Sequence, residues 1–266
     1  MAKLYIVATP IGNLNDVTFR AVETLRGVDV IACEDTRHTL ALLNRYEIKK
    51  PLYSYYKQKE KEGSEYIAEL VESGKDVALV SDAGMPCVSD PGSVVVKEFL
   101  SRGLEYTVIP GASAVVCAAA LTGVDGPFTF IGFLPEKAKD RTELLTRHKD
   151  TGATLIVYSA PHDLNKIMQI LYENLGERRA YFVKEISKIY ERVTEGYLST
   201  LREENAKGEY VIVIEPAEKS SEVTDVDIKN ALNDKIASGV DKKTAIGAVA
   251  DLYKVSKNRV YKISLE

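Results

Sequence analysis

Short apolar runs alternate with amphipathic stretches through the first 124 residues, and this alternation restricts the possible folds more than any other feature. The runs Lys3–Thr9, Val28–Cys33, Asp76–Val80 and Tyr106–Ile109 are predicted to be strands. Helices are expected between them, the clearest over Glu60–Ser73. Strands that alternate with helices form a mostly parallel sheet with helices on both faces, so we expect an α/β fold.

The first helix is expected directly after the first strand. Asn15 or Asp16 is predicted to cap it, and Gly27 to end it. Apolar residues three positions apart lie on one side of a helix. We therefore expect Phe19, Val22 and Leu25 to form the face that packs on the sheet.

A turn-rich segment, Gly123-Val-Asp-Gly-Pro127, interrupts this pattern. Three turn residues in five positions indicate a boundary, so residues 1–124 are predicted to be the first domain. Residues 125–217 are expected to form a second domain with a mixed α/β layer. Its strands are predicted at Phe128–Phe133, Ala153–Tyr158, Arg179–Lys184 and Tyr210–Ile214.

Residues 218–266 are predicted to be a small helical piece behind a polar linker at Glu218–Thr224. The last part resembles a helix-turn-helix in which Ser256 caps the second helix. The side chains that would face a nucleic-acid backbone are Lys257, Arg259 and Lys262. The alternative is a helical appendage that packs on the body of the protein or on a partner.

Composition excludes several classes of protein. The chain has 266 residues, of which 45% are hydrophobic and 28% charged, the ordinary balance of a globular protein. No apolar run approaches the ~18 residues of a membrane span, and the first residues lack a signal-peptide pattern, so we expect a cytoplasmic protein without a membrane. Three cysteines without a Cys-x-x-Cys pair and three scattered histidines predict no metal site. A net charge of −4 argues against a globally basic surface.

Four loops rich in Gly, Pro, Asp and Ser follow predicted strands. They are Thr9–Asn13, Cys33–Arg37, Ser81–Pro86 with its continuation Ser89–Gly92, and Pro110–Ala114. Ligands of open α/β sheets bind at the carboxyl ends of the strands, so four such loops predict a ligand crevice there. The sequence has neither Gly-x-Gly-x-x-Gly after the first strand nor a P-loop, which excludes those two nucleotide sites.

These four loops, together with Gly132-Phe-Leu-Pro135, resemble motifs of one family in the same order along the whole chain. It is the group of bacterial small-subunit ribosomal RNA 2′-O-ribose methyltransferases within the tetrapyrrole-methylase superfamily. The resemblance implies methylation of a cytidine ribose in the decoding region, with S-adenosylmethionine as the cofactor. It also implies two α/β domains with the cofactor between them, a homodimer, and a substrate within the assembled 30S subunit.

The resemblance further implies which residues line the cofactor cleft. They are Pro10 and the loop with Asp82, Ala83, Gly84 and Met85. Ser113 and Ala114 begin a helix, so their N–H groups would point into the crevice, and Tyr158 would close over the cofactor. Each role has a plainer alternative: Asp82 can satisfy its own turn, Ser113 can be an ordinary N-cap, and Tyr158 can be a core residue.

Direct methyl transfer needs alignment of oxygen, methyl and sulfur, and a base near the hydroxyl assists it. Glu34, Asp35 and Lys184 are the candidate catalytic residues. The first two follow the second strand, and Lys184 lies at a strand end of the second domain. The sequence does not choose among them.

Basic residues near these loops are candidates for RNA binding. Arg37 can hold a phosphate, or it can form a local ion pair with the acids beside it. Lys137, Lys139 and Arg141 form a basic cluster beside Gly132–Pro135, which is either a phosphate-binding rim or a solvated face.

Two other functions compete with RNA methylation. The first is methylation of a small molecule such as a tetrapyrrole on the same fold, which predicts porphyrinoid binding and no response to RNA. The second is a non-catalytic DNA-binding regulator, which predicts duplex binding by residues 218–266 alone.

Overall fold

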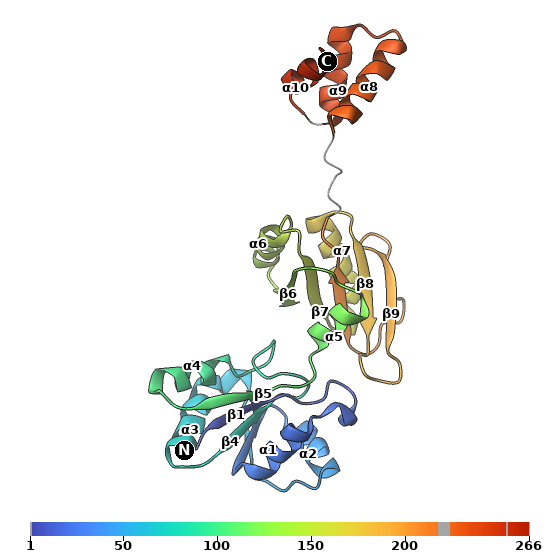
Figure 1. The fold of residues 1–266 in the computed structure, drawn as a ribbon. Helices are drawn as coiled ribbons and strands as arrows, with labels where there is room; N and C mark the ends of the chain where they lie inside the picture. The colour runs from blue at the N-terminus through green and yellow to red at the C-terminus, as the bar shows by residue number, and fades with distance from the viewer. Residues whose placement is uncertain (1, 218–223, 254, 266) are drawn as a thin grey trace. The chain divides into compact units, whose positions relative to one another are not determined.

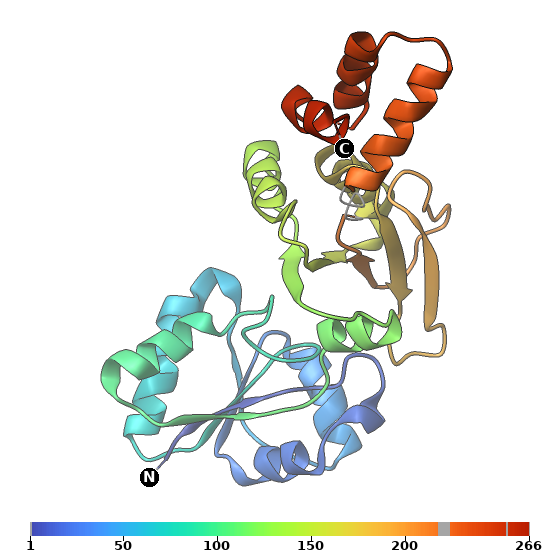
Figure 2. The same cartoon turned by 45° about the horizontal axis from the view of Figure 1, so that its top comes forward.

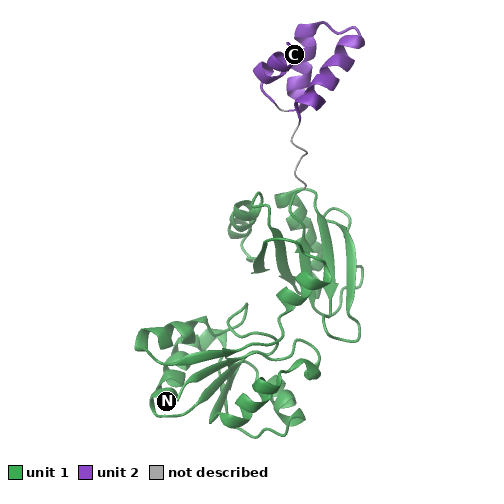
Figure 3. Ribbon diagram, in the orientation of Figure 1, with its two compact units in different colours: residues 1–217 green, residues 218–266 purple. Residues whose placement is uncertain are grey.

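The computed structural model describes residues 2–217, 224–253 and 255–265. The chain divides into two compact units, residues 1–217 and residues 218–266 (Figure 3). The first unit contains two five-stranded sheets, one after the other along the chain (Figures 1 and 2). Among the helices of the described residues, none has the length and apolar character needed to cross a bilayer.

The first sheet is entirely parallel, with strand order β3-β2-β4-β1-β5. Its strands are β1 (Leu4–Val7), β2 (Val30–Cys33), β3 (Leu52–Ser54), β4 (Val77–Val80) and β5 (Tyr106–Ile109). The central strand β4 is buried along its whole length because helices cover both faces. The predicted α/β fold with a parallel first sheet is confirmed.

Two pairs of helices cover this sheet. On one face lie α1 (Phe19–Gly27) and α2 (Thr36–Arg45), whose buried Leu25 and Leu43 pack with Ile31. On the other lie α3 (Glu60–Glu72) and α4 (Ser93–Arg102), whose Ile67 and Phe99 pack with Leu79. Single turns of 3₁₀ helix precede α1 and α3, namely η1 (Leu14–Asp16) and η2 (Lys57–Lys59).

The start of α1 differs from the prediction. Thr18, not Asn15 or Asp16, is the N-cap, and its hydroxyl accepts a hydrogen bond from the Ala21 N–H at 3.1 Å. Val22 and Leu25 are buried as expected, but Phe19 is 92% exposed. Phe19 is the first residue of α1, and its side chain lies outside the face that Val22 and Leu25 bury against the sheet. Three-residue spacing alone does not reveal where the buried face begins.

The second sheet is mixed, as predicted, with strand order β6-β7-β10-β8-β9. Its strands are β6 (Phe128–Phe133), β7 (Thr154–Ser159), β8 (Arg179–Lys184), β9 (Arg192–Tyr197) and β10 (Tyr210–Ile214). Strands β6 and β7 run parallel, and the other pairs are antiparallel. Strand β9 was not predicted, because it is an edge strand paired with β8 alone and has no buried apolar run.

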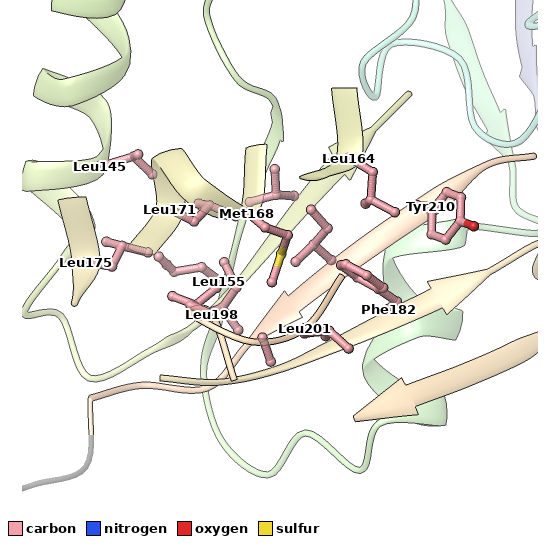
Figure 4. Close-up of a cluster of buried hydrophobic side chains, with 14 residues drawn as sticks. Leu145, Leu155, Leu164, Met168, Leu171, Leu175, Phe182, Leu198, Leu201 and Tyr210 are labelled. Carbon is pink, nitrogen blue, oxygen red and sulfur yellow. The ribbon is translucent and has the colours of Figure 1, made fainter. Parts of the chain in front are cut away.

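Helices also cover both faces of the second sheet. On one side lie α6 (Ala138–His148), the short η3 (Pro161–Asp163) and α7 (Leu164–Leu175). Leu145, Met168 and Leu171 from α6 and α7 meet Phe182 of β8 in a buried cluster (Figure 4). On the other side, α5 (Ala114–Leu121) packs together with Ile11 from the loop after β1. Ile11 therefore ties the first sheet's loops to the second sheet.

The second unit is a three-helix structure with its own core. It comprises α8 (Asp225–Ala237), α9 (Lys242–Tyr253) and α10 (Lys257–Ile263). Side chains of all three helices, such as Leu232, Val249 and Val260, form the buried cluster. The Ser256 hydroxyl accepts from the Arg259 N–H at 3.2 Å, which confirms the predicted cap. Of the predicted linker Glu218–Thr224, residues 218–223 lie outside the described residues.

Candidate functional site

Loops after four parallel strands meet at one edge of the first sheet. Those after β1 and β4 are joined directly, because the Thr9 N–H donates to the Gly84 carbonyl at 2.8 Å and the Gly84 N–H donates back to Thr9 at 3.1 Å. The Thr9 hydroxyl also donates to the Ser81 carbonyl at 3.1 Å. These bonds fix the loop after β4 against the loop after β1.

A cavity of about 370 Å³ lies at this edge, between the loops of the first sheet and the second sheet. From the first half of the unit it is lined by Ile11, Ala83, Gly84, Met85, Val88, Ser89, Asp90, Ser113 and Ala114. From the second half it is lined by Phe133, Tyr158, Ser159, Ala160, Pro161, Val183, Ile186, Glu209, Tyr210 and Val211. Its size and its mostly apolar walls with a few polar groups are typical of small-molecule sites.

The loop that brings Asp90 into this cavity is held rigidly. Cys87 and Ser89 have positive φ angles of 71° and 70°, which non-glycine residues rarely adopt. The Glu60 carboxylate accepts a hydrogen bond from the Gly92 N–H at 2.9 Å. Unusual backbone held in this way is a feature of ligand-binding loops.

Asp90 is a half-buried carboxyl group beside other acids. Burial raises its pKa to about 6, and the charges of Glu34 and Asp82 add to the effect. Burial also raises the pKa of the Tyr158 hydroxyl to about 12, with Asp90 as the next contribution. The cavity thus contains a carboxyl group that changes its charge near neutral pH.

Aromatic rings form part of the second-half wall. Tyr158 packs edge-on against Phe130 at 4.8 Å and against Phe133 at 5.5 Å between ring centroids. The buried Tyr210 hydroxyl has no hydrogen-bond partner among the described residues. The Tyr210 ring packs against Phe182 in the buried cluster of the second sheet, so this hydroxyl lies in the core and not at the cavity surface.

At another part of the wall, charges are paired. The Lys188 ammonium lies 2.9 Å from both the Glu185 and the Glu209 carboxylates. Burial by itself would raise the pKa of Glu185 and lower that of Lys188. Their hydrogen bonds and opposite charges outweigh burial, so the pKa of Glu185 is lowered and that of Lys188 is raised. The charge of Glu209 in the cavity wall is therefore balanced by a neighbouring cation.

The structure places six of the eight predicted cofactor residues in the cavity wall. They are Ala83, Gly84, Met85, Ser113, Ala114 and Tyr158. Pro10 is buried next to Ile11 and does not line the cavity. Asp82 also lies outside the lining, where its carboxylate accepts from the Asp35 N–H at 3.0 Å and faces His38 Nδ1 at 3.4 Å. Ser113 stands at the N-cap position of α5, but its side chain makes no capping bond.

The three predicted catalytic residues lie outside the lining. The Asp35 carboxylate caps α2 by accepting from the Arg37 N–H at 2.8 Å, and its hydrogen bonds with the Arg37 side chain lower its pKa. Burial raises the pKa of Glu34, followed by the charge of Asp82. The Lys184 ammonium lies 5.4 Å from the centre of the Tyr210 ring.

The predicted RNA-binding residues are mostly exposed. Arg37 is 86% exposed although it pairs with Asp35 at 2.5 Å. Lys137 and Lys139 are exposed at the start of α6. Arg141 is half-buried and donates to the carbonyls of Pro135 and Glu136, both at 3.3 Å.

Sequence reasoning did not single out Asp90, Phe133 or the Glu209–Val211 segment. The motifs Ser89–Gly92 and Gly132–Pro135 contain the first two, so a signal was present. The start of β10 carries no motif and reaches the cavity through sheet pairing with the ends of β7 and β8. In the part of the chain that the structure describes, no group of three or more His, Cys, Asp or Glu side chains is arranged to hold a metal ion.

A family model and two similar proteins of known name all identify this chain as similar to methyltransferases. The model of the tetrapyrrole (corrin/porphyrin) methylases matches residues 3–202. The ribosomal RNA small subunit methyltransferase I of Bacillus subtilis (strain 168) is 39% identical over 98% of this chain and 93% of that protein. The protein of the same name from Coprothermobacter proteolyticus is 37% identical over 82% of this chain and 100% of that protein.

Solved structures share the fold at low sequence identity. The methyltransferase CobJ superposes with a TM-score of 0.65 at 18% identity and covers 82% of this chain and 95% of its own. Diphthine synthase superposes with a TM-score of 0.67 at 17% identity and covers 81% of this chain and 90% of its own.

Proposed function

This chain belongs to the tetrapyrrole (corrin/porphyrin) methylase family, among the ribosomal RNA small subunit methyltransferases I, and we propose that it methylates small-subunit ribosomal RNA. As a member it is an enzyme that takes its methyl group from S-adenosylmethionine. The proposed acceptor is the 2′-oxygen of a cytidine ribose in the decoding region. The observation that carries this proposal is the relationship to the Bacillus subtilis protein over 98% of the chain.

The cavity fits the cofactor in size and chemistry. The small residues Ala83, Gly84 and Ala114 let backbone N–H and C=O groups approach a ligand. We propose that Asp82 and Pro10, just outside the lining, support these loops. S-adenosylmethionine supplies a methyl group that its sulfonium already activates. The protein aligns acceptor and donor and excludes water, to which the rings of Phe133 and Tyr158 contribute.

Four basic residues are proposed to hold the RNA. Lys137 and Lys139 are exposed and suited to phosphate contacts, while Arg141 supports their turn through its bonds to Pro135 and Glu136. Arg37 projects into solvent with Asp35 fixing its guanidinium. Glu34, Asp35 and Lys184 lie outside the cavity lining, so we propose that they assist the reaction through neighbouring residues and do not themselves accept the hydroxyl proton.

The setting of the reaction is proposed as well. A ribosomal substrate implies a cytoplasmic enzyme and an assembled 30S subunit as the acceptor. A homodimer is supported by apolar side chains left exposed on α5 and on the edge strand β9. These are Val116, Leu121, Val193 and Tyr197. An edge strand with exposed apolar residues is suited to contact a second copy.

The test is transfer of labelled methyl from S-adenosylmethionine to purified 30S subunits, with naked ribosomal RNA and a tetrapyrrole as parallel acceptors. We expect label that ribonuclease releases and that maps to one ribose by resistance to mild alkali. Comparison of subunit with naked RNA identifies the acceptor. Label on the tetrapyrrole alone would support small-molecule methylation instead and refute the proposal.

A further inference from the structure

Two carboxylates line the cavity, and they differ in how their charge is balanced. Glu209 is 2.9 Å from the Lys188 ammonium and its side chain is largely exposed. Asp90 is half-buried, and it forms no ion pair with any residue in the described part of the chain. An unpaired, partly desolvated carboxylate in a cavity wall is costly to keep, which points to a chemical role.

We propose that Asp90 is the residue that accepts the proton of the 2′-hydroxyl during methyl transfer, a role that rests on the proposed function. The O–H bond of the ribose breaks and an O–H bond to the Asp90 carboxylate forms. In the same step the ribose oxygen bonds the methyl carbon, and the S–CH₃ bond breaks to leave a neutral thioether. The proton then passes from Asp90 to solvent.

Position supports this role. The Met85–Gly92 loop is anchored at Gly92 by Glu60, and the Val88 N–H donates to the Met85 carbonyl at 3.3 Å. Its backbone leaves little freedom for Asp90, and a base must be held within hydrogen-bond reach of its proton. The same loop provides Met85 to the wall, so cofactor and base are positioned by one rigid element.

Charge supports it as well. Three groups face Asp90: Glu34 in the loop after β2, Asp82 in the same loop as Asp90, and Tyr158 on β7. The Cys87 thiol, in the same loop as Asp90, is affected by the Asp90 charge as well. Burial, followed by the charges of Glu60 and Asp90, raises the pKa of Cys87 to about 11. With a pKa of about 6, Asp90 is ionised at neutral pH and still basic enough to take a proton.

Asp35, by contrast with Asp90, is unsuitable as the base. Its carboxylate is occupied by the Arg37 backbone and guanidinium, and its pKa is lowered. A weakly basic, already bonded carboxylate is a poor proton acceptor. Glu34 is better described as a positioning residue, whose negative charge keeps the pKa of Asp90 high.

The experiment compares the full-length wild type with Asp90→Asn, using 30S subunits as acceptor between pH 5 and pH 9. We expect Asp90→Asn to bind S-adenosylmethionine with a dissociation constant within about threefold of wild type by calorimetry. Its single-turnover transfer rate should fall by about 100-fold or more. The wild-type rate should rise with pH around a midpoint near 6, and the variant should lack this dependence. Asp125→Asn, an exposed carboxyl in the loop before β6, is the matched control.

Glu34→Gln provides a second test that does not remove the base. It should keep most of the activity and move the midpoint of the wild-type pH profile to lower pH. Wild-type rate and pH profile in Asp90→Asn would overturn the assignment. So would a large loss of cofactor affinity with an unchanged rate at saturation. Failure of the wild type to label any RNA would instead refute the proposed function, so the two failures are distinguishable.

Discussion

At the scale of single residues, neighbouring loops give two aspartates opposite properties. Asp35 caps a helix and is bonded to Arg37, so its pKa is lowered. Asp90 is partly buried beside Glu34 and Asp82, so its pKa rises to about 6. The difference lies in the partners and not in the residue type, which is how one fold separates structural from chemical carboxylates.

The raised pKa of Asp90 predicts a cost in stability. The ordinary value is 3.8 and the folded value about 6, so the ionised carboxylate destabilises the folded state above pH 6. Below pH 3.8 the group is protonated in both states and the cost disappears. Asp90→Asn should therefore raise the free energy of unfolding at pH 8 by roughly 1–2 kcal/mol, allowing for partial exposure.

Urea unfolding at pH 8 and pH 5 measures this effect. The gain from Asp90→Asn should be larger at pH 8, with Asp125→Asn showing little change at either pH. A variant less stable than wild type at pH 8 would show that the carboxylate is a structural acceptor and would contradict the prediction.

At the scale of elements, helix α4 is flanked by a glycine at each end, and the two glycines are required for different structural reasons. Gly103 ends the helix in the left-handed region at φ 66°, and a Cβ there would meet nothing within 4 Å. Gly92 begins the helix at φ 140°, where a Cβ would lie 2.5 Å from the Cys87 sulfur and 3.1 Å from Leu79 Cδ2. The absence of a side chain at Gly92 therefore also allows Cys87, in the loop that lines the cavity, to pack closely against it.

These two glycines form a matched pair of variants. Gly103→Ala should cost about 1 kcal/mol of stability through backbone strain alone and leave cofactor affinity unchanged. Gly92→Ala should cost more, about 2–4 kcal/mol, because strain and overpacking add. It should also weaken S-adenosylmethionine binding, since the loop that it displaces lines the cavity. Urea unfolding and calorimetry measure both effects; equal losses in the two variants would contradict this account.

At the scale of the whole molecule, the two units have separate cores. The Coprothermobacter proteolyticus relative is matched over its full length by 82% of this chain, the share that residues 1–217 represent. The cavity lies entirely in that first unit. We therefore infer that the first unit contains the catalytic apparatus and that the three-helix unit assists binding of the substrate.

Removal of residues 218–266 tests this division. The remaining chain should bind S-adenosylmethionine with unchanged affinity and keep its rate at saturating substrate. The KM for 30S subunits should rise by about tenfold, equivalent to about 1.4 kcal/mol. The salt dependence should weaken, because Lys243, Lys257 and Lys262 are removed. Steady-state kinetics at two salt concentrations measures both quantities, and an unchanged KM would exclude a role of the second unit in substrate binding.

Patterns confined to one element were sufficient for much of the fold. The strands at Phe128–Phe133, Arg179–Lys184 and Tyr210–Ile214 have the predicted bounds, because each contains a short run of apolar and aromatic residues. Tyr210–Ile214 is buried throughout, whereas Phe128–Phe133 is partly exposed. The cap at Ser256 also depends on residues within one turn. Parallel pairing follows from the strand–helix alternation, so the meeting of loops at one sheet edge was predictable as well.

What depended on contacts between distant parts of the chain was decided by the tertiary structure alone. No local sequence pattern indicates that Phe19 is exposed or that β9 forms an edge strand. The same holds for the position of Glu209–Val211 in the cavity wall. Asp90 was visible in a motif, but its raised pKa arises first from burial and then from the charges of Glu34, in the loop after β2, and of Asp82, in its own loop. The sequence by itself determined the elements and the family motifs, since these are written in short-range patterns. Burial and charge at the site were determined by packing, because both are sums over neighbours far apart in the chain.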